Sequence, residues 1–123
     1  MEKDFYDALF YDANIHRITK IAINREYEYQ YLCELLKCKE VDLIEHFEGF
    51  SIIMDGTGFF KQNNLVNKMK GIENPIAGNA IIAGMLNQGE TLESLNENIT
   101  ADYVLNLITP YAKITPVSDV VKK

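Results

Sequence analysis

The stretch IAGNAIIAG, residues 76–84, combines small and β-branched apolar residues with two glycines. A second stretch of this kind, FSIIMDGTG, occupies residues 50–58. Short apolar runs bounded by turn residues are typical of strands in a sheet. We therefore predict one continuous strand at residues 76–86, another strand at residues 50–54, and a turn at residues 55–58.

Hydrophobic periodicity on either side of these stretches indicates the remaining elements. Residues 26–37 carry apolar side chains at helical spacing, and residues 41–46 alternate as the first strand of a hairpin with residues 50–54. The other expected elements are a helix at residues 2–11, a helix that begins at Thr100 and is closed by Pro110, strands at residues 15–23 and 113–117, a turn at residues 87–90, and a surface segment at residues 61–71. This order favours an α+β fold, a small and mainly antiparallel sheet with two or three helices packed on one face.

The chain of 123 residues has the length of one domain, and its hydrophobic content of 47% suffices for a core. We expect a single domain over residues 1–123, with an N-terminal extension at residues 1–14 that forms a short helix and a C-terminal tail at residues 109–123. No run approaches the roughly 18 apolar positions of a membrane span, and the first residues are acidic where a secretory signal is basic. These features predict a cytoplasmic protein.

The net charge of −6 comes from the first half of the chain. Residues 1–60 hold 12 acids and six bases, whereas residues 61–123 hold six of each. Nucleic-acid binding depends on Lys and Arg contacts to phosphates, and the sequence has no basic stripe. We expect no direct nucleic-acid binding and no membrane association. The acidity serves solubility, or it forms a face that docks on a basic partner.

The residue types that carry catalysis or metal binding do not form a known set in this sequence. The run at residues 55–58, Asp-Gly-Thr-Gly, differs from the Asp-Thr-Gly of aspartic proteases by an inserted glycine. The two histidines and two cysteines lack the paired spacing of a zinc site. We expect no catalytic residue, no metal and no cofactor. Cys33 and Cys38 are expected to be reduced thiols on different bearings of one helix.

Five of the seven tyrosines occur before residue 32. Tyrosine is enriched at protein interfaces because it combines a broad apolar ring with a polar tip. Two interpretations stay open: the tyrosines of the first long helix pack against the core, or an exposed surface of tyrosines and acids binds a protein. The predicted contact surface consists of Tyr6, Asp7, Tyr11, Asp12, Tyr27, Glu28 and Tyr31.

Several short motifs follow one another along the chain. They are the Tyr/Leu-rich run at residues 29–32, the hairpin at residues 41–45 and 50–54, the Asp-Gly turn, the loop Asn63-Asn64, the run at residues 76–82, Leu95, and the helix start at residues 100–104. Their order resembles a family of small domains of unknown function that phages, plasmids and integrated elements encode. The resemblance covers residues 15–108, and it implies no catalytic residue because the family has none assigned.

These observations lead to three functional hypotheses. The first is a non-enzymatic accessory protein of a mobile element, which binds a host or self protein through its acidic first half, for example to counter a host defence or restriction system. The alternative is a module that binds a small ligand, such as a nucleotide signal, in a pocket near Asn63, Asn64 and Asn79. A homo-oligomer that forms by pairing of exposed strand edges is the third.

Overall fold

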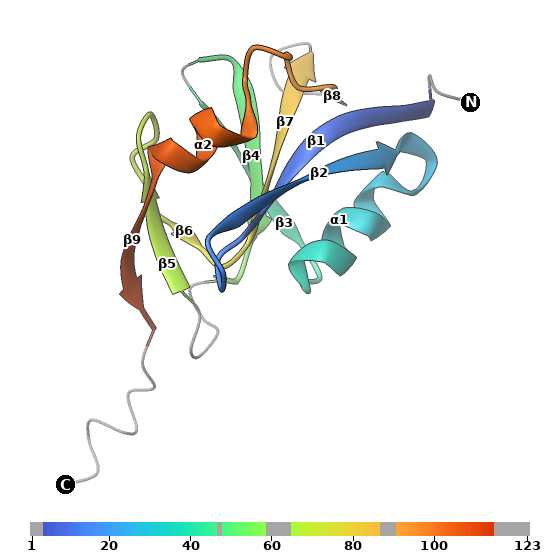
Figure 1. Cartoon of the computed structure of the whole chain (residues 1–123). Helices are drawn as coiled ribbons and strands as arrows, with labels where there is room; N and C mark the ends of the chain where they lie inside the picture. Colours follow the sequence, from blue (N-terminus) through green and yellow to red (C-terminus); the bar gives the residue numbers. More distant parts are fainter. Residues whose placement is uncertain (1–3, 47, 59–64, 87–90, 115–123) are drawn as a thin grey trace, which may run out of the picture.

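The computed structural model describes residues 4–46, 48–58, 65–86 and 91–114, and strands dominate this part of the chain (Figure 1). The elements are β1 (Phe5–Asp12), β2 (Arg17–Asn24), α1 (Glu28–Leu36), β3 (Val41–Glu45), β4 (Phe50–Asp55), β5 (Leu65–Met69), β6 (Ile76–Ala77), β7 (Ala80–Leu86), β8 (Thr91–Glu93), α2 (Ala101–Leu107) and β9 (Ile108–Lys113). Within the described ranges, neither helix has the length and apolar character to cross a membrane.

Strand β7 lies at the centre of the larger of two antiparallel sheets. The strand order of this main sheet is β2-β1-β7-β4-β3, and β8 pairs with the second half of β7. Ile81 of β7 is in register with Phe10 of β1 on one side and with Ile53 of β4 on the other. Neighbouring β-branched and aromatic side chains stabilise strand pairs of this kind. The sequence stretch at residues 76–84 therefore supplies the central strand.

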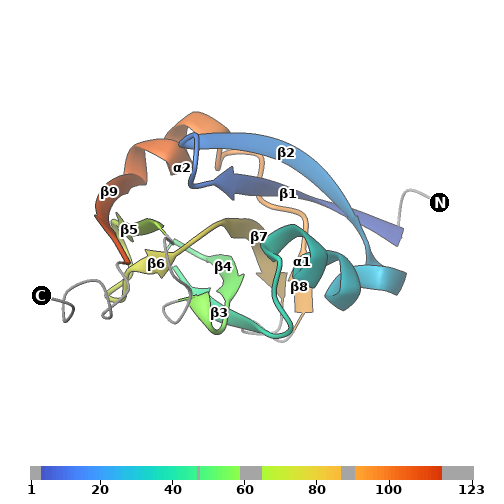
Figure 2. The ribbon, with the colours of Figure 1, turned by 90° about the horizontal axis from the view of Figure 1, so that it is seen from below.

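Both faces of the main sheet are covered, and by different elements. Ile82 packs in a cluster with Val104 of α2 and with residues of the smaller sheet, whose order is β6-β5-β9. Ile81 packs on the opposite face in a cluster with Leu36 of α1. In Figure 2, α2 lies beside β9 and β5, whereas α1 lies away from them.

The predicted α+β fold with its helices on one face of a single sheet is wrong. Consecutive side chains of a strand point to opposite faces, so the adjacent isoleucines of β7 demand cover on both sides. A second sheet with α2 supplies one cover, and α1 supplies the other. The result is a mostly β protein with two antiparallel sheets.

The predicted single strand at residues 76–86 is also corrected. It consists of β6 in the smaller sheet and β7 in the main sheet, separated at Gly78, whose φ of 85° is readily adopted only by glycine. The Gly78 N–H donates to the Leu65 carbonyl at 2.7 Å, and the Asn79 side chain accepts from the Ala13 N–H at 2.8 Å. These bonds fix the point at which the chain passes from one sheet to the other.

The predicted helix at residues 2–11 is wrong, because residues 5–12 form β1. Tyr6 and Ala8 are buried towards α1, and Leu9 and Tyr11 are buried towards the smaller sheet. The strand pairs with β2 along its whole length, from Phe5 opposite Asn24 to Asp12 opposite Arg17. Tertiary pairing therefore overrides a local pattern that fits helical spacing.

Two further predictions fail in the second half of the chain. Within the predicted surface segment, residues 65–69 form β5, and Val66, Asn67 and Met69 are buried. Pro110 does not close α2, which ends at Leu107, but lies in β9 opposite Asn67, next to the register shift that leaves Tyr111 as an extra residue in β9. Proline is tolerated there because β9 is an edge strand. Residues 61–64, 87–90 and 115–117 lie outside the described residues, and β8 was not predicted.

The other local predictions are confirmed. The strand at residues 15–23 corresponds to β2, the helix at residues 26–37 to α1, and the predicted hairpin to β3 and β4. Thr100 is the N-cap of α2, and its side chain accepts a hydrogen bond from the Tyr103 N–H at 3.1 Å. Each of these elements has its signal within a short window of sequence.

Gly84 allows the segment after β8 to approach β7 closely, which gives a test of the packing. A Cβ at position 84 would overlap the Ser94 carbonyl oxygen. We predict that Gly84→Ala lowers the free energy of unfolding by about 1–3 kcal/mol, the usual cost of overpacking, as measured by urea denaturation. The control is Gly56→Ala, whose Cβ would lie 3.3 Å from its nearest neighbour, the Glu40 carbonyl oxygen. Equal losses in the two variants would contradict the described approach.

Candidate functional site

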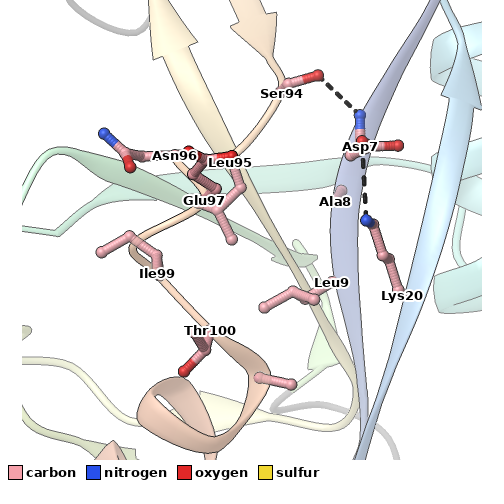
Figure 3. A pocket seen from close by; sticks show the side chains of 11 residues that line it. Asp7, Ala8, Leu9, Lys20, Ser94, Leu95, Asn96, Glu97, Ile99 and Thr100 are labelled. Carbon is pink, nitrogen blue, oxygen red and sulfur yellow. Dashed lines mark hydrogen bonds and ion pairs between the residues drawn. The ribbon is translucent and has the colours of Figure 1, made fainter.

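A groove of about 720 Å³ lies between the β1–β2 hairpin and the segment that joins β8 to α2 (Figure 3). One wall consists of Asp7, Ala8 and Leu9 from β1 together with Lys20 from β2. Residues 94–97 and 99–101 form the other wall. We call this site the hairpin groove.

The second wall is held to β1 by hydrogen bonds at one residue. The Leu95 N–H donates to the Asp7 carbonyl at 3.0 Å, and the Asp7 N–H donates to the Ser94 hydroxyl at 3.0 Å. Beside Asp7, β7 no longer pairs with β1, because Gly84 of β7 pairs with Glu93 of β8 instead. The chain after β8 thus takes the place beside β1 that β7 has left.

Turn residues shape the rest of this wall. The Asn96 side chain accepts from the Asn98 N–H at 2.9 Å, and its carbonyl accepts from the Ile99 N–H at 2.8 Å. Asparagine side chains favour such local turns. Thr100 then caps α2, so the wall is ordered from Ser94 to the first turn of the helix.

The hairpin groove combines an apolar floor with a charged rim. Leu9, Leu95 and Ile99 supply the apolar surface (Figure 3). At the rim, the Asp7 carboxylate lies 4.0 Å from the Lys20 ammonium group, with side chains 58% and 74% exposed. An ion pair this exposed contributes little to stability. Both charges are therefore accessible to a bound molecule.

The predicted contact surface is not assembled as expected. Tyr6 and Tyr11 are only 2% and 0% exposed, because they lie on opposite faces of β1 and each face is covered at that position, so they cannot contact a partner. Asp7 is the member of the predicted set that lines the hairpin groove. Asp12 accepts the Asn14 N–H at 3.0 Å in the β1–β2 turn.

The remaining members of that set lie around α1. Tyr27 is 55% exposed, whereas Tyr31 is half-buried against the cluster under α1. The half-buried Glu28 accepts a hydrogen bond from the Tyr6 hydroxyl at 2.5 Å, so its carboxylate is the partner of a buried core side chain. The seven residues therefore form no common surface.

The predicted ligand loop is described only in part. Asn63 and Asn64 lie outside the described residues. Asn79 lines a polar cavity of about 170 Å³ together with Asp55 and Lys37. This volume is below the roughly 300–1,000 Å³ of most ligand pockets.

Residues 55–58 behave as the predicted turn. The Asp55 carboxylate accepts from the Thr57 N–H at 2.8 Å and from the Thr57 hydroxyl at 3.0 Å.

His46 is buried, stacks on Phe50, and is bonded to the Lys70 carbonyl through Nε2 at 2.7 Å. Across the described part of the chain, no three His, Cys, Asp or Glu side chains gather as a metal site.

Sequence reasoning missed most of the hairpin groove. The sequence pattern places Lys20 only within a strand, and it assigns no helix or strand to residues 94–99. Ser94, Asn96 and Asn98 are turn-forming residues, so a non-helical stretch before Thr100 was detectable. Its position against β1 was not, since that depends on where β7 and β1 separate.

Comparisons with known proteins add no relative. No family model matches the chain, and no curated protein or solved structure matches it significantly.

The buried tyrosines of β1 predict loss of stability at alkaline pH. Burial, with a smaller contribution from the Asp12 charge, raises the pKa of Tyr11 to about 12. Burial and the hydrogen bond with Glu28 also raise the pKa of Tyr6. An unfolded tyrosine ionises near pH 10, so the unfolded chain loses these protons first, and the free energy of unfolding should fall from about pH 10 to about pH 12.

The measurement is urea denaturation as a function of pH. Tyr11→Phe should reduce the slope of the free energy of unfolding above about pH 10, because the titrating group is gone. Tyr27→Phe, at an exposed side chain, is the control and should keep the wild-type slope. An unchanged slope in Tyr11→Phe would contradict the role of its burial.

Proposed function

We propose that the protein is a non-catalytic binding protein whose hairpin groove takes an apolar side chain of a protein partner. The observation that carries this proposal is the apolar floor of Leu9, Leu95 and Ile99 beneath the exposed charges of Asp7 and Lys20. Protein interfaces have this composition, an apolar centre with a polar rim.

The surface beside the groove favours a partner larger than a metabolite. Phe5, Asp7 and Leu9 alternate along β1 and therefore face the same side of the sheet. Phe5 is 45% exposed, so apolar surface continues past the rim of the groove. A protein can cover this aromatic ring and fill the groove together, which a small molecule confined to the groove does not do.

The resemblance to domains of phages, plasmids and integrated elements supports the setting of the proposal. In that setting the partner is a cytoplasmic host or self protein, and components of host defence or restriction systems are the first to test. Exposed acids such as Asp7 and Glu97 favour a partner segment with a basic residue next to its apolar anchor.

Site-specific photo-crosslinking tests this proposal. A photoreactive phenylalanine analogue replaces Lys20, which lines the groove, or Thr19, its exposed neighbour, whose side chain points to the other face of β2. In the encoding cell, we expect a protein adduct from position 20 and none from position 19. The same adducts from both positions, or an adduct from position 19 alone, would contradict a partner in the groove.

The volume of the hairpin groove also fits a small ligand, which keeps the second candidate function open. A ligand that binds only the folded state raises its stability, by about 2.7 kcal/mol at a concentration of 100 Kd. If the partner is a protein, nucleotides should leave the thermal midpoint unchanged. A rise with one nucleotide that is lost in Lys20→Glu but kept in Thr19→Glu would favour the small-ligand function.

A further inference from the structure

The C-terminus of α1 ends in a left-handed turn that brings two cysteines together. Lys37 follows the last helical residue with φ 54° and ψ 52°. The Lys37 N–H donates to the Glu34 carbonyl at 3.3 Å, and the Cys38 N–H donates to the Cys33 carbonyl at 3.0 Å. This pair of bonds defines a Schellman motif, in which the residue after the left-handed position folds back onto the last turn of the helix.

Cys33 and Cys38 occupy the two positions of this motif between which a side-chain contact is frequent. These positions usually carry a hydrophobic pair. The expectation that the two cysteines lie on different bearings of one helix is wrong, because α1 ends at Leu36 and the turn at Lys37 reverses the chain. Both thiols are half-exposed, and they line the same shallow hollow of about 560 Å³.

The side chain of Tyr29 adds a polar group beside the two cysteines. It lies in the same hollow and donates to the Lys39 carbonyl at 3.0 Å. Its pKa is raised by desolvation, by a hydrogen bond with Cys33, and by the charges of Cys33, Glu40 and Cys38. The charges of both cysteines thus act on the phenol of Tyr29.

We propose that Cys33 and Cys38 form a redox modification site, a dithiol that closes reversibly to a disulfide by exchange with a low-molecular-weight disulfide of the glutathione class. The thiolate of one cysteine attacks a sulfur of oxidised glutathione and releases one glutathione thiolate. The second thiolate then attacks the cysteine sulfur of the mixed disulfide and releases the other glutathione. The dithiol loses two electrons and two protons, and oxidised glutathione becomes two molecules of reduced glutathione.

This site is separate from the hairpin groove, so it does not depend on the proposed binding function. The cysteines lie at the end of α1, and the groove is lined by residues of β1, β2 and the segment before α2. The proximity of the thiols in the folded protein should raise the equilibrium constant for disulfide formation above that of the unfolded chain, because folding has already brought the sulfurs together.

The test compares the folded and unfolded protein in glutathione redox buffers. Thiols are trapped by alkylation and counted by mass spectrometry. We expect both thiols of the folded protein to disappear together, with loss of two hydrogens and a peptide that links Cys33 to Cys38. The equilibrium constant should be at least about tenfold larger than in guanidinium chloride. By reciprocity, the disulfide form should resist denaturation by the same factor.

Single-cysteine variants complete the experiment. Cys33→Ser and Cys38→Ser retain one thiol each and should stop at the mixed disulfide with glutathione. An equilibrium constant in the folded protein equal to or below that of the unfolded chain would overturn the proposal. Accumulation of a wild-type species with one glutathione on each cysteine would do the same, because adjacent thiols displace a bound glutathione.

Discussion

The burial of β7 on both faces and along both edges is the constraint around which the other elements are arranged. Ile81 and Ile82 are adjacent, so their side chains must be buried on opposite faces of the main sheet. Full burial of a side chain of this size contributes about 1.5–3 kcal/mol. The chain meets this demand with α1 on one face and with α2 and the smaller sheet on the other.

The same strand determines where the hairpin groove lies. β7 pairs with β1 only as far as Leu9 opposite Ile82, and beyond that point its edge pairs with β8. The first half of β1 therefore curves away with β2 as its remaining strand partner, and the chain after β8 binds to Asp7. The hairpin groove is the space between the first half of the β1–β2 hairpin and the segment after β8, at the point where β1 no longer pairs with β7.

Elements with a local signal could be predicted, and elements decided by long-range pairing could not. The side chain of Thr100 is an N-cap signal that predicts α2, and the apolar spacing of residues 26–37 is enough to predict α1. In β1, the same residues fit a helix by spacing and a strand by alternation. Only pairing with β2 and β7, which the sequence does not display, selects the strand.

The candidate site shows the same division. Asp7 is among the predicted contact residues, but so are Tyr6 and Tyr11, which are buried by the elements that cover the two faces of β1. The position of the wall at residues 94–101 could not be predicted, because polar turn residues indicate irregular structure but do not indicate which strand it packs against. The proximity of Cys33 and Cys38 was missed because the predicted helix includes Lys37, the residue at which the chain makes a left-handed turn.

Gly78 has a consequence for how the molecule comes apart. Residues 76 and 77 belong to the smaller sheet and residues 80–86 to the main sheet, with two residues between them. Separation of the two sheets therefore pulls directly on β6, an edge strand of the smaller sheet, and on β7, the central strand of the main sheet. Such continuity makes partial opening costly and couples the two sheets into one cooperative unit, so that calorimetric and van't Hoff enthalpies of melting should coincide.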